Sequence, residues 1–257
     1  MTMTCRVCNK DEYKCILMGN GYGLWKCGGC GVVMTVGKFD DSQYQSEKEL
    51  EKQYIFQKEL FEDCAKDIVK HFPITSGKLL DIGCGLGWLV NQAQKMGFNA
   101  IGIDSGKACI DVGKKYLHAN IKYCSLENFK SQEKFDLITL NHVLEHIEHP
   151  NIFLSKTKSF LKENGYIIVA CPNINSLMFK IFRQKWYGLV PNQHRFQYSP
   201  KSLKFLLEKT GFKAEKVVIN NLDYKVRGFK GLIFNLILKI ADITKTGDQV
   251  IIIAKHE

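Results

Sequence analysis

The strongest constraint on the fold is an alternation of apolar, strand-like runs with helix-like segments between Lys78 and Asn173. The strand-like runs are KLLDIG, NAIGID, IKYCS, FDLITLN and YIIVACP. The segments between them include WLVNQAQKMG, GKACIDVGKKYL and NIFLSKTKSFLKENG, of which the first and last are expected to end at Gly97 and Gly165. Two later runs, KAEKVVIN and QVIIIAK, also read as strands. The pattern predicts an α/β fold with a doubly wound, mostly parallel, seven-stranded sheet.

Four cysteines near the N-terminus form two CxxC pairs, Cys5 with Cys8 and Cys27 with Cys30. A two-residue gap lets both thiolates of a pair reach one ion about 2.3 Å away, and two pairs complete a tetrahedron. A segment this short has little other means of stability, so we predict a structural zinc ribbon over residues 1–40. Redox chemistry is the alternative interpretation, but it requires one motif beside a βαβ unit rather than two on a short ribbon.

The rest of the chain divides into a linker and one larger domain. Apolar residues at three- and four-residue steps predict a helix over about 45–72, inside a linker region 41–77, and Pro73 ends it. Residues 78–257 are expected to form the larger domain, with 172–200 as its lid segment.

An apolar helix is expected near 229–242, flanked by Lys225, Arg227, Lys230 and Lys245. We interpret it as a buried helix that joins the last two strands, or as a homodimer contact. A membrane-surface anchor is the less favoured alternative.

Net charge and cysteine content indicate which binding partners and which cell compartment to expect. The 257 residues carry a net charge of +10, but the lysines are scattered and only four arginines occur. This pattern argues against nucleic-acid binding, which favours clustered arginine, whereas a basic field attracts a small anionic substrate. The start MTMTCRVC has no export signal, no run of 18 apolar residues occurs, and ten cysteines favour a reducing compartment, so we expect a cytoplasmic protein.

The run LLDIGCGLG, at 79–87, places three glycines at alternate positions directly after a predicted strand. Glycine inside an element costs about 0.5–1 kcal/mol relative to alanine, so a sharp turn against a ligand is the expected reason. Asp104 ends the next strand, where a carboxylate can bind ribose hydroxyls. A loop that binds a dinucleotide would have the pattern GxGxxG, whereas the spacing here is GxGxG. Asp81 precedes the first glycine by two residues, and a carboxylate at this position suits a cationic group of the ligand better than a diphosphate. S-adenosylmethionine (SAM) combines a ribose with a cationic amino-acid end.

These residues, followed by FDLITLNHVLEHIEHP, resemble the class I SAM-dependent methyltransferases of small molecules over roughly residues 45–215. The resemblance implies that the glycines cradle the methionine end of SAM, that Asp81 lies near its amino group and that Asp104 holds the ribose. Many members carry Asp where Ser125 stands. The cofactor residues that follow from the loop and the resemblance are Asp81, Gly83, Cys84, Gly85, Gly87, Asp104, Ser125, Leu126 and Asn141.

Two histidines are the candidate catalytic residues. His194 lies in the predicted lid, and a histidine side chain ordinarily titrates near neutrality, which suits a general base. The resemblance implies that His142 closes the site from the fourth strand. The run from His142 to His146 also spells HxxEH, an inverted zinc-protease motif, but it ends a strand rather than lying on a helix. His146 and His149 are therefore interpreted as turn and surface residues.

Phosphate contact is a further candidate role for three basic lid residues, Arg183, Lys185 and Arg195. The function predicted overall is SAM-dependent methyl transfer to a small anionic metabolite. The ribbon ahead of this core resembles methyltransferases of deoxysugar and surface-polysaccharide pathways, which implies a nucleotide sugar or polysaccharide precursor. The alternatives are an RNA or protein methyltransferase that grips its substrate with the ribbon, and a non-catalytic SAM-fold binding protein.

Overall fold

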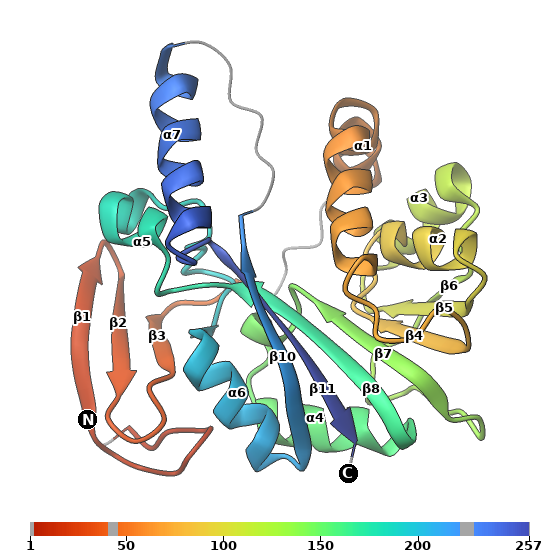
Figure 1. Cartoon of the computed structure of the whole chain (residues 1–257), viewed down its shortest axis with the longest axis horizontal. Helices are drawn as coiled ribbons and strands as arrows, with labels where there is room; N and C mark the ends of the chain where they lie inside the picture. Colours follow the sequence, from red (N-terminus) through yellow and green to blue (C-terminus); the bar gives the residue numbers. More distant parts are fainter. Residues whose placement is uncertain (1–2, 41–45, 222–228, 257) are drawn as a thin grey trace. The chain divides into compact units, whose positions relative to one another are not determined.

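The computed structural model describes residues 3–40, 46–221 and 229–256, which form two β-sheets and the helices around them (Figure 1). The larger sheet has seven strands in the order β10-β11-β8-β7-β4-β5-β6. Their bounds are β4 Lys78–Ile82, β5 Asn99–Asp104, β6 Ile121–Tyr123, β7 Phe135–Asn141, β8 Leu161–Pro172, β10 Phe212–Asn220 and β11 Gln249–His256.

The predicted doubly wound sheet is confirmed. Strand β4 pairs in parallel with both β5 and β7, and β5 pairs in parallel with β6. The strand order reverses between β4 and β7, which makes this the switch point where sheets of this class bind ligands.

One compact unit comprises Ser42–Asn141, Ser155–Val169 and Ile253–Glu257. Its first helix, α1 (Glu47–Val69), begins with a capping box in which Ser46 and Glu49 bond each other's backbone amides. Figure 1 shows α1, α2 (Trp88–Lys95) and α3 (Lys107–Leu117) on the same side of β4, β5 and β6. The Tyr54 ring of α1 stacks on Trp88 and Tyr116, which fixes α1 to both other helices.

The second compact unit comprises Met1–Asp41, His142–Leu154 and Ala170–Ile252. It contains the small sheet, in the order β1-β2-β3-β9, of which the first three strands are antiparallel neighbours in the N-terminal ribbon. The ribbon strands are β1 Tyr13–Gly19, β2 Tyr22–Cys27 and β3 Val33–Gly37. The fourth strand, β9 (Phe196–Gln197), comes from the predicted lid and pairs antiparallel with β3. The sequence pattern does not predict this pairing of the lid with the ribbon.

Short helices complete the chain. They are η1 Leu144–His146, α4 Pro150–Ser159, α5 Leu177–Phe182, η2 Arg183–Lys185, α6 Pro200–Lys209 and α7 Phe229–Ile243. None of the helices in the described ranges is long and apolar enough to cross a membrane.

One predicted helix end is right and one is wrong. Gly97 follows α2 with a φ of 96°, as expected for a glycine after a helix. Gly165 lies inside β8, because α4 already ends at Ser159. Phe160 and Leu161 are buried, and the Phe160 carbonyl accepts a hydrogen bond from the Phe135 amide at 2.9 Å, so this stretch joins β7 instead of extending the helix.

Helix α7 connects the last two strands, as predicted, but it is not buried around its whole circumference. Phe234, Ile237 and Leu238 pack on a core cluster that includes Trp186. The opposite side chains are exposed, namely Ile233, Leu236, Ile240 and Ile243. The flanking Lys225 and Arg227 lie outside the described residues, as does the side chain of Lys230.

Candidate functional site

The glycine loop follows β4 and leads into α2, at the switch point of the sheet. Gly85 has a φ of 53°, and a Cβ added there would meet no atom within 4 Å. Gly87 has a φ of 87°, and an added Cβ would come within 2.8 Å of Ala119 and 2.9 Å of Ile121. Gly87 is therefore required for packing, whereas Gly85 leaves open space beside the backbone for a ligand.

Asp104, at the end of β5, holds this loop in place. Its Oδ2 accepts a hydrogen bond from the Gly85 amide at 2.8 Å, and its Oδ1 accepts one from the Gly106 amide at 2.7 Å. Each carboxylate oxygen has a second lone pair, so the residue can still accept bonds from two ligand hydroxyls. The geometry fits the predicted contact with a ribose.

Asp81 lies in β4 and is buried. Its Oδ1 accepts a 2.7 Å hydrogen bond from the Thr139 hydroxyl of β7. Burial raises the pKa of Asp81 to about 7, and the charge of Asp104 acts in the same direction, while the bond from Thr139 opposes them. A cationic group placed beside this carboxylate would favour its ionised form. Asp81 therefore fits the amino group of SAM.

The other predicted cofactor residues differ in what their side chains contact. Cys84 is buried against β5, where a Cβ on Gly102 would come within 2.7 Å of its Sγ, so this side chain is part of the packing. Ser125 begins a turn in which its carbonyl accepts a bond from the Phe129 amide, and Leu126 is buried. Asn141 ends β7, and its Oδ1 is buried with no hydrogen-bond partner among the described residues. An unpaired buried oxygen is costly, so it is a place for a ligand donor.

A second group of polar side chains lies in the other compact unit. The donor atoms of Glu145, His146 and His194 all lie within 4.8 Å of one another. Glu145 and His146 belong to η1, whereas His194 precedes β9 far along the chain. We call these three residues the histidine–glutamate cluster. The sequence predicts His146 to be a turn residue and HxxEH not to be a metal motif. The turn is present, but it directs the His146 side chain into this cluster.

His142 is linked to the cluster by its ring. Its Nδ1 lies 3.3 Å from Glu145 Oε1, and its Nε2 lies 2.9 Å from the amide nitrogen of Gln249. An amide N–H donates, so His142 Nε2 accepts and the proton resides on Nδ1, toward Glu145. Both nitrogens are occupied, and the residue has a φ of 56°. This geometry makes His142 a group that positions Glu145.

The charge states of Glu145 and His194 suit a metal ion. Glu145 is only 1% exposed, and although burial raises its pKa, contact with His142 and the charges of His194 and His146 lower it to about 2. Burial lowers the pKa of His194 to about 4, against the opposing effect of Glu145. Its Nδ1 is buried with no hydrogen-bond partner among the described residues. An ionised carboxylate and neutral imidazoles are the forms that bind divalent cations.

The four cysteines of the ribbon form the other candidate metal centre. Their sulfur atoms lie within 4.8 Å of one another, with Cys5 to Cys30 at 3.7 Å and Cys8 to Cys27 at 3.5 Å. Sulfurs bound to one tetrahedral zinc ion at about 2.3 Å are about 3.8 Å apart, so the cluster has the right size. Cys15 is not part of it, and its thiol contacts the Leu17 carbonyl.

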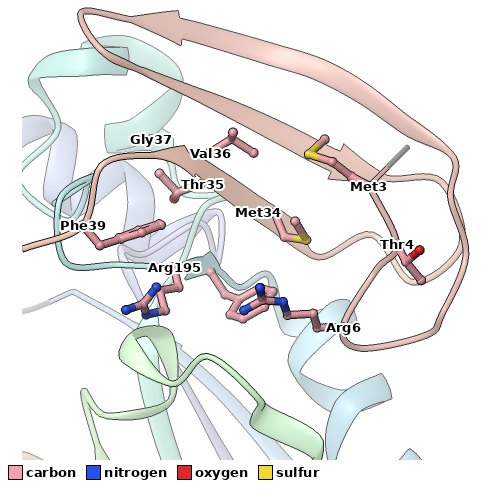
Figure 2. A pocket seen from close by; sticks show the side chains of 10 residues that line it. Met3, Thr4, Arg6, Met34, Thr35, Val36, Gly37, Phe39 and Arg195 are labelled. Carbon is pink, nitrogen blue, oxygen red and sulfur yellow. The ribbon is translucent and has the colours of Figure 1, made fainter. Parts of the chain in front are cut away.

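Two of the residues predicted to contact phosphate, Arg183 and Arg195, have different surroundings in the structure. Arg183 donates to the Ile16 carbonyl at 2.8 Å and lies over the Phe179 ring, so it joins the lid to the ribbon. Arg195 instead lines a cavity together with Arg6, Met34 and Phe39 (Figure 2).

Comparison with known proteins gives matches to methyltransferases. A family model described as "Methyltransferase domain" matches residues 56–217. The chain is 29% identical over 170 residues to a ubiquinone biosynthesis O-methyltransferase of Pelagibacter ubique, an alignment that covers 59% of this chain and 71% of that protein. It is 30% identical over 161 residues to the mitochondrial enzyme of the same name from Mus musculus, covering 56% of this chain and 44% of the mouse protein.

Solved structures agree on the fold. A SAM-dependent methyltransferase of Archaeoglobus fulgidus has a TM-score of 0.58 at 24% identity, covering 80% of this chain and 99% of that one. Another, from Aquifex aeolicus, has a TM-score of 0.56 at 18% identity, covering 83% and 100%.

Proposed function

Because this chain belongs to the methyltransferase-domain family and is a SAM-dependent methyltransferase, we propose that it methylates a hydroxyl oxygen of a small molecule. Both curated relatives described above are O-methyltransferases by name. Neither name refers to sugars, so the nucleotide sugar or polysaccharide precursor expected from the sequence gains no support.

The first unit supplies the cofactor site in this proposal. SAM brings a methyl group that its sulfonium already activates, so the protein's tasks are alignment and exclusion of water. Asp81 would face the amino group, Asp104 the ribose hydroxyls and Asn141 a further donor. The open backbone at Gly85 admits the amino-acid end.

The histidine–glutamate cluster is the observation that carries the choice of oxygen. Three donor atoms within 4.8 Å, one of them a carboxylate that is 1% exposed, favour a divalent cation held by Glu145, His146 and His194. A cation there would supply Lewis acidity to an oxygen atom that binds it, such as a hydroxyl whose pKa it lowers. This proposal changes the role predicted for His194 from base to ligand, because a pKa of about 4 makes it a weak base near neutral pH.

The ribbon would hold a separate, structural zinc ion with Cys5, Cys8, Cys27 and Cys30. Thiolates select zinc, whereas carboxylate and imidazole also accept Mn²⁺. Imidazole also binds zinc, and more tightly than Mn²⁺, so the protein is loaded with one equivalent of zinc before Mn²⁺ is added.

The experiment uses zinc-loaded protein with isotopically labelled SAM and a panel of small phenols, each paired with its amine analogue. We expect mass spectrometry to identify a methyl ether that forms faster when Mn²⁺ is added, and Mn²⁺ binding to be lost in Glu145→Gln. Products methylated only on nitrogen or carbon, or label found only in added RNA or protein, would refute the proposal.

A further inference from the structure

Helix α7 carries apolar side chains on two faces, and only one of these faces packs on the core cluster that includes Trp186. The packed side chains are Phe234, Ile237 and Leu238. The other face consists of four side chains at steps of three, four and three residues, Ile233, Leu236, Ile240 and Ile243. We call these four the exposed stripe of α7, because their exposed fractions lie between 43% and 82%. A helix that only joins two strands needs one apolar face, so the exposed stripe is a candidate interaction surface.

The exposed charges on α7 and on the element beside it are mostly positive. Lys239 lies on α7, and Lys180 and Lys185 lie on α5 and η2; all three are exposed. Helix α5 packs against α7, and Figure 1 shows it next to the base of that helix. The whole stretch 164–207, which contains α5 and η2, has no acidic residue, and Asp242 is the one acidic residue within α7. This distribution favours an anionic partner.

A second copy of the chain is the alternative partner for an apolar stripe. A twofold interface places the same surface of both copies together, so it would also bring the lysines of both copies close to each other. A stable interface needs about 20–30 residues a side, whereas the stripe supplies four side chains. An anionic bilayer presents neither difficulty, because it takes up apolar side chains and its phosphate groups attract lysine.

The length of α7 fits a helix that lies on a bilayer. Its 15 residues extend over about 22 Å at 1.5 Å per residue, which is shorter than the hydrocarbon core of about 30 Å. Helices that lie in the interface combine an apolar face with basic residues, and α7 with its neighbour α5 supplies both.

We propose that α7 lies on the surface of an anionic phospholipid bilayer, with its exposed stripe among the acyl chains next to the head groups and Lys180, Lys185 and Lys239 facing phosphates. The sequence favours a buried helix or a homodimer contact for this segment. The exposure of a second apolar face, which only the structure shows, favours the bilayer instead. The proposal is independent of the methyl acceptor and of both candidate metal centres.

The test is flotation of zinc-loaded, full-length protein with two kinds of vesicle, one of phosphatidylcholine alone and one in which a third of the lipid is phosphatidylglycerol. We expect the mixed vesicles to bind about tenfold more protein than phosphatidylcholine alone, and added salt to weaken that binding because it screens exposed charges. No binding to either vesicle, or equal binding to both, would overturn the proposal. SAM is absent from the experiment, so such a result leaves the proposed methyl transfer unaffected.

Matched substitutions assign the binding to α7. Leu236→Gln and Ile240→Gln remove apolar contacts at exposed positions, and each should weaken binding about fivefold or more. Ile152→Gln is the control, at an isoleucine of α4 that is 69% exposed, and should leave binding nearly unchanged. Lys239→Glu should weaken binding about fivefold more than Lys114→Glu, an exposed position of α3 at which the net charge changes by the same amount. Equal effects in the glutamine variants and their control, or in the two glutamate variants, would refute the assignment to α7.

Ile240→Trp distinguishes insertion into lipid from a loss of folding. Tryptophan is favoured at membrane interfaces, so this variant should bind vesicles at least as tightly as the wild type, and bromine-labelled acyl chains should quench its added fluorescence. Sedimentation velocity without lipid examines the second copy. A dimer that Leu236→Gln converts to monomer, together with unquenched fluorescence in Ile240→Trp, would overturn the proposal in favour of a homodimer contact.

Discussion

The cysteine cluster and the histidine–glutamate cluster have similar dimensions but different origins. In both, the donor atoms lie within 4.8 Å of one another. The cysteine cluster is made by two tight turns of one short ribbon, and each turn sets the spacing of its own pair. The histidine–glutamate cluster joins a 3-10 turn to a loop far along the chain. The comparison teaches that a candidate metal centre can be predicted from sequence when its ligands lie in tight turns close together in the chain.

The two clusters are also connected through the ribbon. Strand β9 begins two residues after His194 and pairs with β3. Lys209 Nζ donates a hydrogen bond to the Val7 carbonyl at 2.6 Å, which connects the turn of the first CxxC pair to α6. The position of His194 therefore depends on a folded ribbon.

The largest effect is expected from Cys27→Ser. Binding of structural zinc by such peptides contributes about 10–16 kcal/mol, so the variant should lose zinc and the ribbon should lose its hydrogen-exchange protection. Mn²⁺ affinity at the histidine–glutamate cluster should fall at least tenfold as His194 loses its support, while SAM affinity stays within a factor of about three because the cofactor residues lie in the other unit.

Cys15→Ser is the matched control for that variant, since Cys15 lies in the same ribbon outside the cluster, and it should keep both zinc and Mn²⁺. Full protection of the ribbon in Cys27→Ser, measured by hydrogen exchange, would show that the cysteine cluster does not depend on metal. That result would refute the prediction that the cysteine cluster, like the histidine–glutamate cluster, is a metal centre.

Glu145→Gln is expected to have the next largest effect. It preserves shape but removes the negative charge, so turnover should fall about 100-fold or more if the cation supplies several kcal/mol of transition-state stabilisation. SAM affinity, measured by calorimetry, should remain within about threefold. His149→Asn is the control, because His149 is exposed and outside the cluster. Equal loss of turnover in both variants would show that the effect is not specific to the histidine–glutamate cluster.

The smallest effect is expected on SAM affinity. The residues predicted to bind SAM belong to neither cluster, so this measurement is a reference for both. The raised pKa of Asp81, about 7, means that its carboxyl is protonated below that pH and ionised above it. A cationic ligand binds the ionised form, so SAM affinity should be highest between pH 7 and the pKa of an α-amino group, about 7.7–8.0. Below pH 7 it should fall by up to about tenfold per pH unit. Asp81→Asn should bind SAM weakly and without this slope. A wild-type profile that is flat from pH 5.5 to 8 would contradict the assignment of Asp81 to the amino group.

Much of the fold was predictable because its signals are local. The apolar runs predicted all seven strands of the large sheet, and the glycine loop was expected at the end of the strand that is now β4. The error at Gly165 has the opposite cause. Its surroundings read as a helix cap by composition, but pairing of residues near Phe160 with β7 extended β8 through it.

The sequence by itself determined the two CxxC turns, the glycine loop and the order of strands and helices, because turn geometry and side-chain periodicity depend on residues close in the chain. Only the tertiary structure decided that β9 completes the ribbon sheet, that His146 and His194 meet at Glu145, and that Arg6 and Arg195 share one cavity. These contacts join segments whose separation in the sequence carries no distance information, and packing of the whole unit selects them.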